Sequence, residues 1–372
     1  PDGSDRVLQC FCCHWPVLRL YAGKTGGKSE SDRCAAERVN LHYHPSGGIL
    51  WKKEDHLEDF LIMKVVDMHC DTIAEIYERR KKGESIDLRK NGLHLDLEKM
   101  KKGDYFLQNF ALFTALKNVE RPFEHTCRLA ETFYEEMEAN KDLIGVIKTY
   151  DDIEENWKKG KMSALLTIEE GGVCQGDLML LRFFYHLGVR MMTLTWNGEN
   201  ELGGGADTAL GLTPFGREAL KEMERLSIVA DVSHASDALF YDVAEIAEKP
   251  IVASHSNARA VCPHRRNLTD RQFQILRDKG GLVGLNFCVH FLREDSNAHF
   301  EDLLRHADHF WSLGGETTLC LGSDYDGTDV PPELDGIEKM QDLYEFFLKH
   351  NYKESLVNSL FFDNVSKFFA TL

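Results

Sequence analysis

Residues 65–71 read VVDMHCD, and this stretch decides how the rest of the chain is interpreted. It places Asp67, His69 and Asp71 at every second position behind a short apolar run, and alternate residues of a strand share one face. An imidazole and a carboxylate at the end of a buried strand are natural ligands for one divalent metal ion. We therefore expect a strand whose carboxyl end carries two ligands, His69 and Asp71.

Similar apolar, β-branched runs recur through residues 63–372 and alternate with amphipathic stretches of helical periodicity. The predicted strands are residues 65–69, 107–113, 163–168, 189–195, 228–232, 250–254, 282–287 and 318–322. The predicted helices include residues 123–140, 214–226, 236–247, 270–279, 300–313, 337–349 and 363–370. Eight such units, with continuous apolar strands and no glycine-rich dinucleotide fingerprint, favour an α/β fold of the (β/α)8 TIM barrel type over an open doubly wound sheet.

Composition narrows the class of protein. The 372 residues are 43% hydrophobic and carry a formal net charge of -17, which argues against partners that are polyanions, such as nucleic acid or an anionic membrane surface. No apolar run approaches the roughly 20 residues that a membrane-spanning helix needs, and the chain does not start with a basic region followed by an apolar stretch. We expect a cytoplasmic protein without membrane insertion. Its cysteines beyond residue 64 are expected to be reduced thiols.

Residues 1–62 differ in character from residues 63–372, because they hold Gly/Ser/Lys clusters and no sustained periodicity. Met63 resembles a translation start placed directly before the first strand. Our hypothesis is that residues 1–62 are a disordered or non-native extension, and that residues 63–372 form the barrel domain.

Ionisable residues stand where five of the predicted strands end, and in a barrel of this type these ends meet at one mouth. They are His69 and Asp71 after the first strand, Glu170 after the third, His234 after the fifth, His255 after the sixth and Asp324 after the eighth. Alternation along the third strand groups Glu170 with Leu166 and Ile168 and excludes Glu169. The same argument excludes Cys70. By contrast, His299, His306 and His309 stand at helical spacing and are interpreted as a solvated helix face.

Such a concentration of unpaired charge at one mouth costs free energy unless a metal compensates it. Three carboxylates and three imidazoles suffice for two cations: His69 and Asp71 would hold one, His234 and His255 the other, and Glu170 would bridge them. Ligands without thiolate suit Zn²⁺, with Mn²⁺ or Co²⁺ as alternatives.

Seven motifs together resemble the membrane (renal) dipeptidase family, metallopeptidases of the amidohydrolase superfamily, from Val65 to the C-terminus. They are VVDMHCDT, LLTIEEGG, MMTLTWNGEN, GLTPFGREAL, DVSHAS, IVASHSNARAVCPHRRNL and LGSDYDG. The resemblance implies a metal-dependent hydrolase barrel with two zinc ions on the ligands named above. It also implies that Asp324 is the acid/base carboxylate, that Arg266 binds the substrate carboxylate, and that dipeptides, including those with a C-terminal D-residue, are the substrates. Relatives are often homodimers.

The chain departs from the family pattern at Trp196, where the mammalian enzymes have a histidine. A Trp can donate a hydrogen bond through its indole N–H but cannot carry charge. Phe291, near a tyrosine position of those enzymes, also changes the pocket.

The expected reaction is attack of a hydroxide bridging two metal ions on the peptide carbonyl, with Asp324 transferring the proton to the leaving amine.

Two alternatives stay open at this point. The first is a binuclear amidohydrolase that acts on another small amide or a lactone, which the change at Trp196 allows. The second is a catalytically inactive metal-binding or interaction protein. Asp324 and Arg266 argue against the second alternative, because a structural metal site needs neither residue.

Overall fold

A computed structural model describes residues 63–370, so the hypothesis about residues 1–62 lies outside the described part of the chain. The strands are β1 Val65–Asp67, β2 Tyr105–Phe113, β3 Ile144–Ile147, β4 Met162–Glu169, β5 Met191–Thr193, β6 Val229–Asp231, β7 Val283–Leu285 and β8 Leu319–Leu321. The α-helices are α1 Thr72–Lys81, α2 Leu97–Lys102, α3 Pro122–Ala139, α4 Tyr150–Lys158, α5 Leu178–Leu187, α6 Pro214–Leu226, α7 Asp237–Ile246, α8 Asp270–Asp278, α9 Val289–Leu292, α10 Phe300–Ser312, α11 Met340–Lys349, α12 Glu354–Asn358 and α13 Asn364–Phe369. Shorter helical turns are η1 Leu116–Asn118, η2 Gly171–Cys174, η3 Pro332–Leu334, η4 Ile337–Lys339 and η5 Ser359–Asp363.

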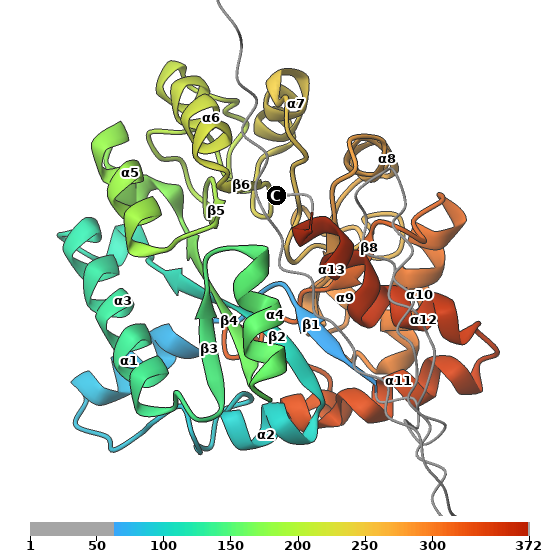
Figure 1. The fold of residues 1–372 in the computed structure, drawn as a ribbon. Coiled ribbons are helices and arrows are strands. Elements are labelled where there is room, and N and C mark those ends of the chain that lie inside the picture. Colours follow the sequence, from blue (N-terminus) through green and yellow to red (C-terminus); the bar gives the residue numbers. More distant parts are fainter. Residues whose placement is uncertain (1–62, 371–372) are drawn as a thin grey trace, which may run out of the picture. The chain divides into compact units, whose positions relative to one another are not determined.

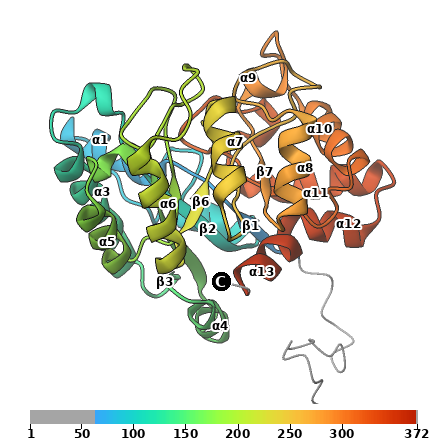
Figure 2. The same ribbon diagram turned by 90° about the horizontal axis from the view of Figure 1, so that it is seen from above.

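The strands form one parallel sheet in the order β6-β5-β4-β2-β1-β8-β7, and β3 pairs with the first half of β4. Isolated bridges from Asp231 to Val252 and from Ala253 to Val283 connect β6 with β7 and close the ring. The helices lie around the strands, as Figure 1 and Figure 2 show. The prediction of an α/β barrel is confirmed.

The eight predicted strands occupy the eight positions of this ring, with two differences from the prediction. Residues 250–254 contribute only bridges rather than a full strand. Their backbone approaches its neighbours closely: a Cβ added to Gly284 or Gly322 would lie 1.9 or 1.8 Å from the carbonyl oxygen of Ser254. The other difference is β3, which the sequence analysis missed because its four residues include Gly145 and a half-buried Val146.

Two apolar clusters hold the barrel together. The smaller one takes side chains from every position of the ring, among them Val66, Leu107 and Leu165, and joins them to Val365 and Phe368 of the α13 region. The larger one packs helix side chains against the outward side of the strands, including Leu166 and Ile168 of β4. Leu165 therefore faces the barrel interior, and Leu166 faces the helices.

Local signals explain where the helices begin. Helix α6 starts after Thr213, whose hydroxyl accepts a hydrogen bond from the Gly216 N–H, with Pro214 in the first turn. Helix α8 starts with a capping box between Thr269 and Gln272.

Among residues 63–370, no helix is both long enough and apolar enough to cross a membrane.

The interpretation of three helical histidines as a solvated face is wrong for His306. This residue of α10 is fully buried: its Nδ1 accepts the Ala258 N–H at 3.0 Å, and its Nε2 lies 3.0 Å from the Leu292 carbonyl oxygen. His306 therefore joins α10 to the loop at Ala258 and to the end of α9 instead of facing water. His299 and His309 remain partly exposed and pair with Glu333 and Asp270.

Candidate metal centre

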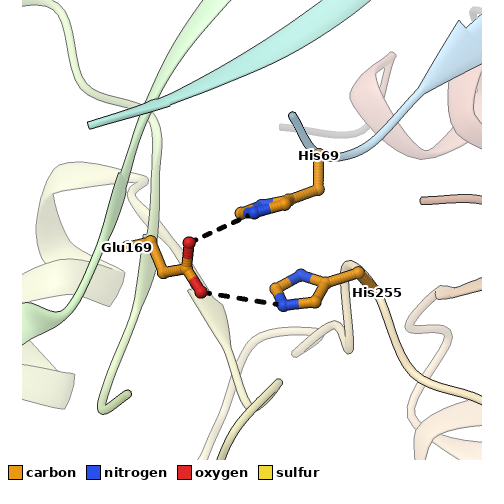
Figure 3. A group of neighbouring side chains, drawn as sticks. All are labelled: His69, Glu169 and His255. Atoms are coloured by element: carbon orange, nitrogen blue, oxygen red, sulfur yellow. Dashed lines mark ion pairs between the residues drawn. The ribbon is translucent and has the colours of Figure 1, made fainter. Parts of the chain in front are cut away.

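Three histidines from separate parts of the chain surround the side chain of Glu169 at the carboxyl ends of the strands. His69 lies two residues beyond β1, and Glu169 ends β4. His255 directly follows residues 250–254, the bridging segment that joins the sheet only by bridges (Figure 3). Glu169 Oε2 lies 3.2 Å from His69 Nε2, whereas Oε1 lies 2.8 Å from His234 Nε2 and 3.8 Å from His255 Nε2. The two oxygens of this carboxylate thus face different imidazoles.

Asp71 and Asp324 complete the cluster on the His69 side. His69 Nε2 lies 3.5 Å from Asp71 Oδ2 and 3.9 Å from Asp324 Oδ1. Asn286 donates a hydrogen bond of 2.9 Å to the other oxygen of Asp324. Gly327 passes so close that a Cβ there would lie 2.1 Å from Asp71 Oδ2. Five of the six predicted cluster residues therefore converge, as the sequence analysis expected.

The sixth, Glu170, is a correction. It lies outside the cluster, and the neighbouring Glu169, which the sequence analysis excluded, takes the place between the histidines. Glu169 continues the inward face of Leu165 and Thr167, whereas Leu166 and Ile168 face the helices. The backbone of Glu170 then turns into the left-handed region, with φ of +89°, and its side chain caps η2.

Alternation holds to the end of β4, and the prediction failed because it took the face of Leu166 and Ile168, which packs against the helices, as the face toward the mouth. His234 and Asp324 also have positive φ, +66° and +65°, just beyond their strands. A non-glycine residue in this region is strained, and such residues gather at functional sites. Their side chains reach the mouth because the backbone turns after the strand, so the parity of the preceding residues carries no information about them.

Burial dominates the electrostatics of the cluster. It raises the pKa of Glu169 to about 8, with a further contribution from Asp71, and raises the pKa of Asp324 to about 6. Burial also lowers the pKa values of His234 and His255 well below the usual range, and the nearby charges of His69 and Arg266 add to this. These two imidazoles are therefore neutral and keep a lone pair for a ligand bond.

Hydrogen bonds outside the cluster orient both imidazoles. His255 Nδ1 lies 2.7 Å from Ser254 Oγ, which donates to Asp231 Oδ2 at 2.5 Å. Because that hydroxyl proton goes to Asp231, Nδ1 of His255 carries a proton and its Nε2 faces the cluster unprotonated. His234 Nδ1 lies 2.8 Å from Asn197 Oδ1. The sequence analysis missed Asp231 and Asn197, although both stand in motifs that it quoted.

The donor set fits divalent cations. Within residues 63–370, His69 Nε2 and Asp71 Oδ1 are buried without a hydrogen-bond partner, although His69 Nε2 lies 3.5 Å from the other oxygen of Asp71. Nearly buried carboxylates in contact with one another need compensating positive charge. Imidazole and carboxylate ligands without thiolate suit zinc, manganese or cobalt. The ligand atoms of His69, Glu169 and His255 lie within 4.8 Å of one another, as do those of His69, Asp71 and Asp324.

A cavity of about 380 Å³ opens above the cluster. Trp196 and Phe291, both singled out from the sequence, line it together with Phe113. Arg266 is buried beside it: its Cζ lies 5.4 Å from the Phe291 ring centre, its Nη2 lies 3.4 Å from the His255 carbonyl oxygen, and its Nε has no hydrogen-bond partner among residues 63–370. The cavity thus joins the cluster to an aromatic wall, and the guanidinium group of Arg266 lies behind Phe291 of that wall.

A parallel α/β barrel with histidines and carboxylates gathered at the carboxyl ends of its strands is the architecture of a metal-dependent hydrolase. Known proteins agree with this class. Residues 60–372 match the family model described as membrane dipeptidase, peptidase family M19. An uncharacterised dipeptidase of Schizosaccharomyces pombe is 31% identical over 304 residues, which cover 75% of this chain and 73% of that protein.

Two solved structures are also similar. Dipeptidase AC, a metallo peptidase of family M19, has a TM-score of 0.78 and 31% identity, covering 83% of this chain and 98% of its own. A metallo peptidase from Rhodobacter sphaeroides, liganded with a phosphinate mimic of the dipeptide L-Ala-D-Ala, has a TM-score of 0.77 and 30% identity, covering 83% and 99%. The chain belongs to the membrane dipeptidase family of metallopeptidases, and it is a metallo-dipeptidase.

Proposed function

We propose that this protein hydrolyses dipeptides with two Zn²⁺ ions as cofactors, and that Glu169 bridges the two ions. The observation that carries the proposal is the position of the Glu169 carboxylate, with one oxygen toward His69 and the other toward His234 and His255. In this proposal His69 and Asp71 hold one ion, and His234 and His255 hold the other. Mn²⁺ or Co²⁺ would fit the same ligands.

Bound zinc ions would polarise the scissile carbonyl and lower the pKa of a water to about 7, which supplies a nucleophile at neutral pH. The chain's own acid/base group in this proposal is Asp324. Its carboxylate lies beside the cluster and lines the cavity, and the Asn286 side chain fixes one of its oxygens. The other oxygen is free to take the proton of the attacking water and to deliver it to the leaving amine.

Arg266 is proposed to bind the C-terminal carboxylate of the substrate. A guanidinium can donate two parallel hydrogen bonds to a carboxylate, and Nε of Arg266 lacks a partner within the described range of residues 63–370. A buried cation at a fixed distance from the catalytic group would limit the enzyme to short peptides. It would also favour a free C-terminus over an amidated one.

The proposed substrates are L,L-dipeptides and, in addition, dipeptides with a C-terminal D-residue. The L-Ala-D-Ala mimic held by the Rhodobacter sphaeroides relative supports the second group. Trp196 is proposed to contact the substrate: its ring lies 5.2 Å from Phe113 and 6.3 Å from His234, measured between centres, on the wall of the cavity. It can donate one hydrogen bond there but adds no charge.

The test is a panel assay of zinc-loaded protein. We expect about two equivalents of metal per chain, turnover of L,L- and L,D-dipeptides, and much slower turnover of N-blocked dipeptides. Faster hydrolysis of a blocked peptide or of a lactone would favour the alternative of another amidohydrolase activity. Two bound metal ions without turnover of any compound would favour a non-catalytic metal-binding protein.

Two other predictions are kept as proposals with their own tests. A cytoplasmic location is supported by the free cysteines among residues 63–370 and by the acidic net charge, and cell fractionation tests it. A homodimer is proposed from the resemblance to relatives alone, and light scattering of the purified protein tests it.

A further inference from the structure

The side chain of Glu170 is buried and fully engaged, although it holds no place in the metal cluster. Its Oε1 accepts the Gly172 N–H at 2.9 Å and a hydrogen bond from the Asn200 side-chain amide, and its Oε2 accepts the Trp196 N–H at 3.0 Å. The residue is 4% exposed. Hydrogen bonds to a buried charged group are among the strong ones, so the two from Trp196 and Asn200 fix the end of β4 to the segment after β5.

That segment, residues 196–200, carries two side chains that matter at the mouth. Trp196 lines the cavity, and Asn197 contacts Nδ1 of His234. Asn200 closes the segment on itself, because its amide also donates to the Leu194 carbonyl oxygen at 2.8 Å. Glu170 therefore holds the segment at both ends. It accepts the Trp196 N–H at the start and the Asn200 side-chain amide at the end.

The ring of Trp196 is the outer part of an apolar wall. It meets Phe113 edge to face, at 5.2 Å between centres and an angle of 61°, and Lys117 Nζ lies 5.4 Å from its centre. Phe113 ends β2, at the second position around the ring. Arg266 follows the bridging segment at the sixth position, which is opposite. A dipeptide whose carboxylate meets Arg266 therefore extends its N-terminal residue toward Phe113 and Trp196.

We infer that Glu170 is a positioning residue: it holds Trp196 against Phe113, and this wall selects dipeptides whose N-terminal side chain is large and apolar. The inference rests on the proposed dipeptide hydrolysis. An edge-to-face aromatic contact with the substrate adds to the hydrophobic contribution of burial. Release of the segment would remove that contribution, and it would also loosen the contact of Asn197 with His234 Nδ1, so metal content is measured beside the substrate preference.

The experiment compares kcat/KM for L-Phe-L-Ala and Gly-L-Ala in the zinc-loaded full chain and in four variants: Glu170→Ala, Glu170→Gln, Trp196→Ala and the double variant with both alanines. We expect the wild-type protein to prefer L-Phe-L-Ala by roughly tenfold or more. Glu170→Ala should reduce the preference to within about twofold when both proteins are compared at full zinc loading, which excludes an effect of Asn197 on the metal ligand His234. In the Trp196→Ala background, the same change at Glu170 should have no further effect on the ratio, because the wall is already gone.

Glu170→Gln is the conservative variant, since it keeps one acceptor oxygen and loses the other. Its preference should lie between those of the wild type and the alanine variant. Glu169→Gln is the contrasting variant, because we expect it to lose metal. Denaturant unfolding of each variant separates loss of the wall from loss of the fold.

Several results would overturn the inference. One is an equal loss of kcat/KM for both dipeptides in the Glu170 variants, which would give the residue only a general structural role. Another is loss of metal in those variants without a change in the preference, which would show that Glu170 acts through Asn197 and His234 rather than through the wall. With L-Lys-L-Ala as a third substrate, a preference for it over L-Phe-L-Ala would assign selection to Glu75 and Glu78, which also line the cavity. Equal turnover of both dipeptides by the wild type would refute selection by the wall but not the dipeptidase proposal. Turnover of neither dipeptide would refute both.

Discussion

Replacement of Asp231 by Asn tests whether the hydrogen bonds behind His255 control metal binding. The Asp231 carboxylate accepts four hydrogen bonds. Its Oδ1 accepts the N–H groups of Ser233 and Ser254, both at 2.9 Å, and its Oδ2 accepts the hydroxyls of Thr193 at 2.7 Å and Ser254 at 2.5 Å. Backbone N–H groups can only donate. The oxygen of the introduced asparagine must therefore stay toward them, and its amide NH₂ must point toward the two hydroxyls.

The consequence passes to His255 through one proton. The Ser254 hydroxyl can no longer donate to the side chain at position 231, so its proton turns to Nδ1 of His255, which lies 2.7 Å away. That nitrogen must then be unprotonated, and the proton of the neutral ring moves to Nε2, the atom that faces Glu169 and His234. A protonated Nε2 cannot coordinate a metal. Changes behind a ligating histidine weaken metal affinity by about 10- to 100-fold, which equals about 1.4–2.7 kcal/mol.

The assay is a competition titration of metal-free protein with zinc and a chelator of known affinity. Thr193→Val is the matched control, because it removes a hydrogen bond to the same carboxylate oxygen but leaves the chain from Ser254 to His255 intact. We expect it to retain metal affinity within about threefold, well short of the range for outer hydrogen-bond partners. If Asp231→Asn bound zinc as tightly as the Thr193→Val protein, control of the His255 tautomer by Asp231 would be refuted.

The same geometry yields three other predictions. Asp324→Asn should lower kcat by about 10²- to 10⁴-fold with little change in KM, as measured by steady-state kinetics. Arg266→Lys should raise KM for free dipeptides by about tenfold, because the paired hydrogen bonds are lost, and should leave KM for C-terminal amides unchanged; equal effects on both would contradict the assignment. Burial lowers the pKa of His306 to about 4, against about 6.5 when unfolded. Its neutral form therefore stabilises the fold fully above pH 6.5 and progressively less as the pH falls toward 4, so the stability cost of His306→Gln should shrink by up to ~3 kcal/mol between pH 7 and 4 in denaturant titrations.

The barrel could be predicted from the sequence because its signal is repeated. Eight apolar runs mark the eight ring positions, and the helix predicted at residues 214–226 has the same bounds as α6. Two features gave weaker signals. The short strand β3 lies outside the ring, and residues 250–254 join the sheet only by bridges. The periodicity that exposed the other elements also misled at His306, because helical spacing alone does not tell which histidine faces the core.

The error at Glu170 has a more general cause, which is that a strand buried on both faces does not reveal its inward face. Alternation of faces holds only while the backbone stays extended, and β4 ends at Glu169. One residue later the chain enters the left-handed region, as it also does at His234 and Asp324. Sequence reasoning located the mouth correctly, because strand ends are visible in the pattern of apolar residues. It chose wrongly between two adjacent glutamates, because every residue of β4 is buried and the sequence does not tell which face of the strand points inward. The neighbouring carboxylates consequently have separate contacts: Glu169 meets the histidines, and Glu170 binds the segment that carries Trp196.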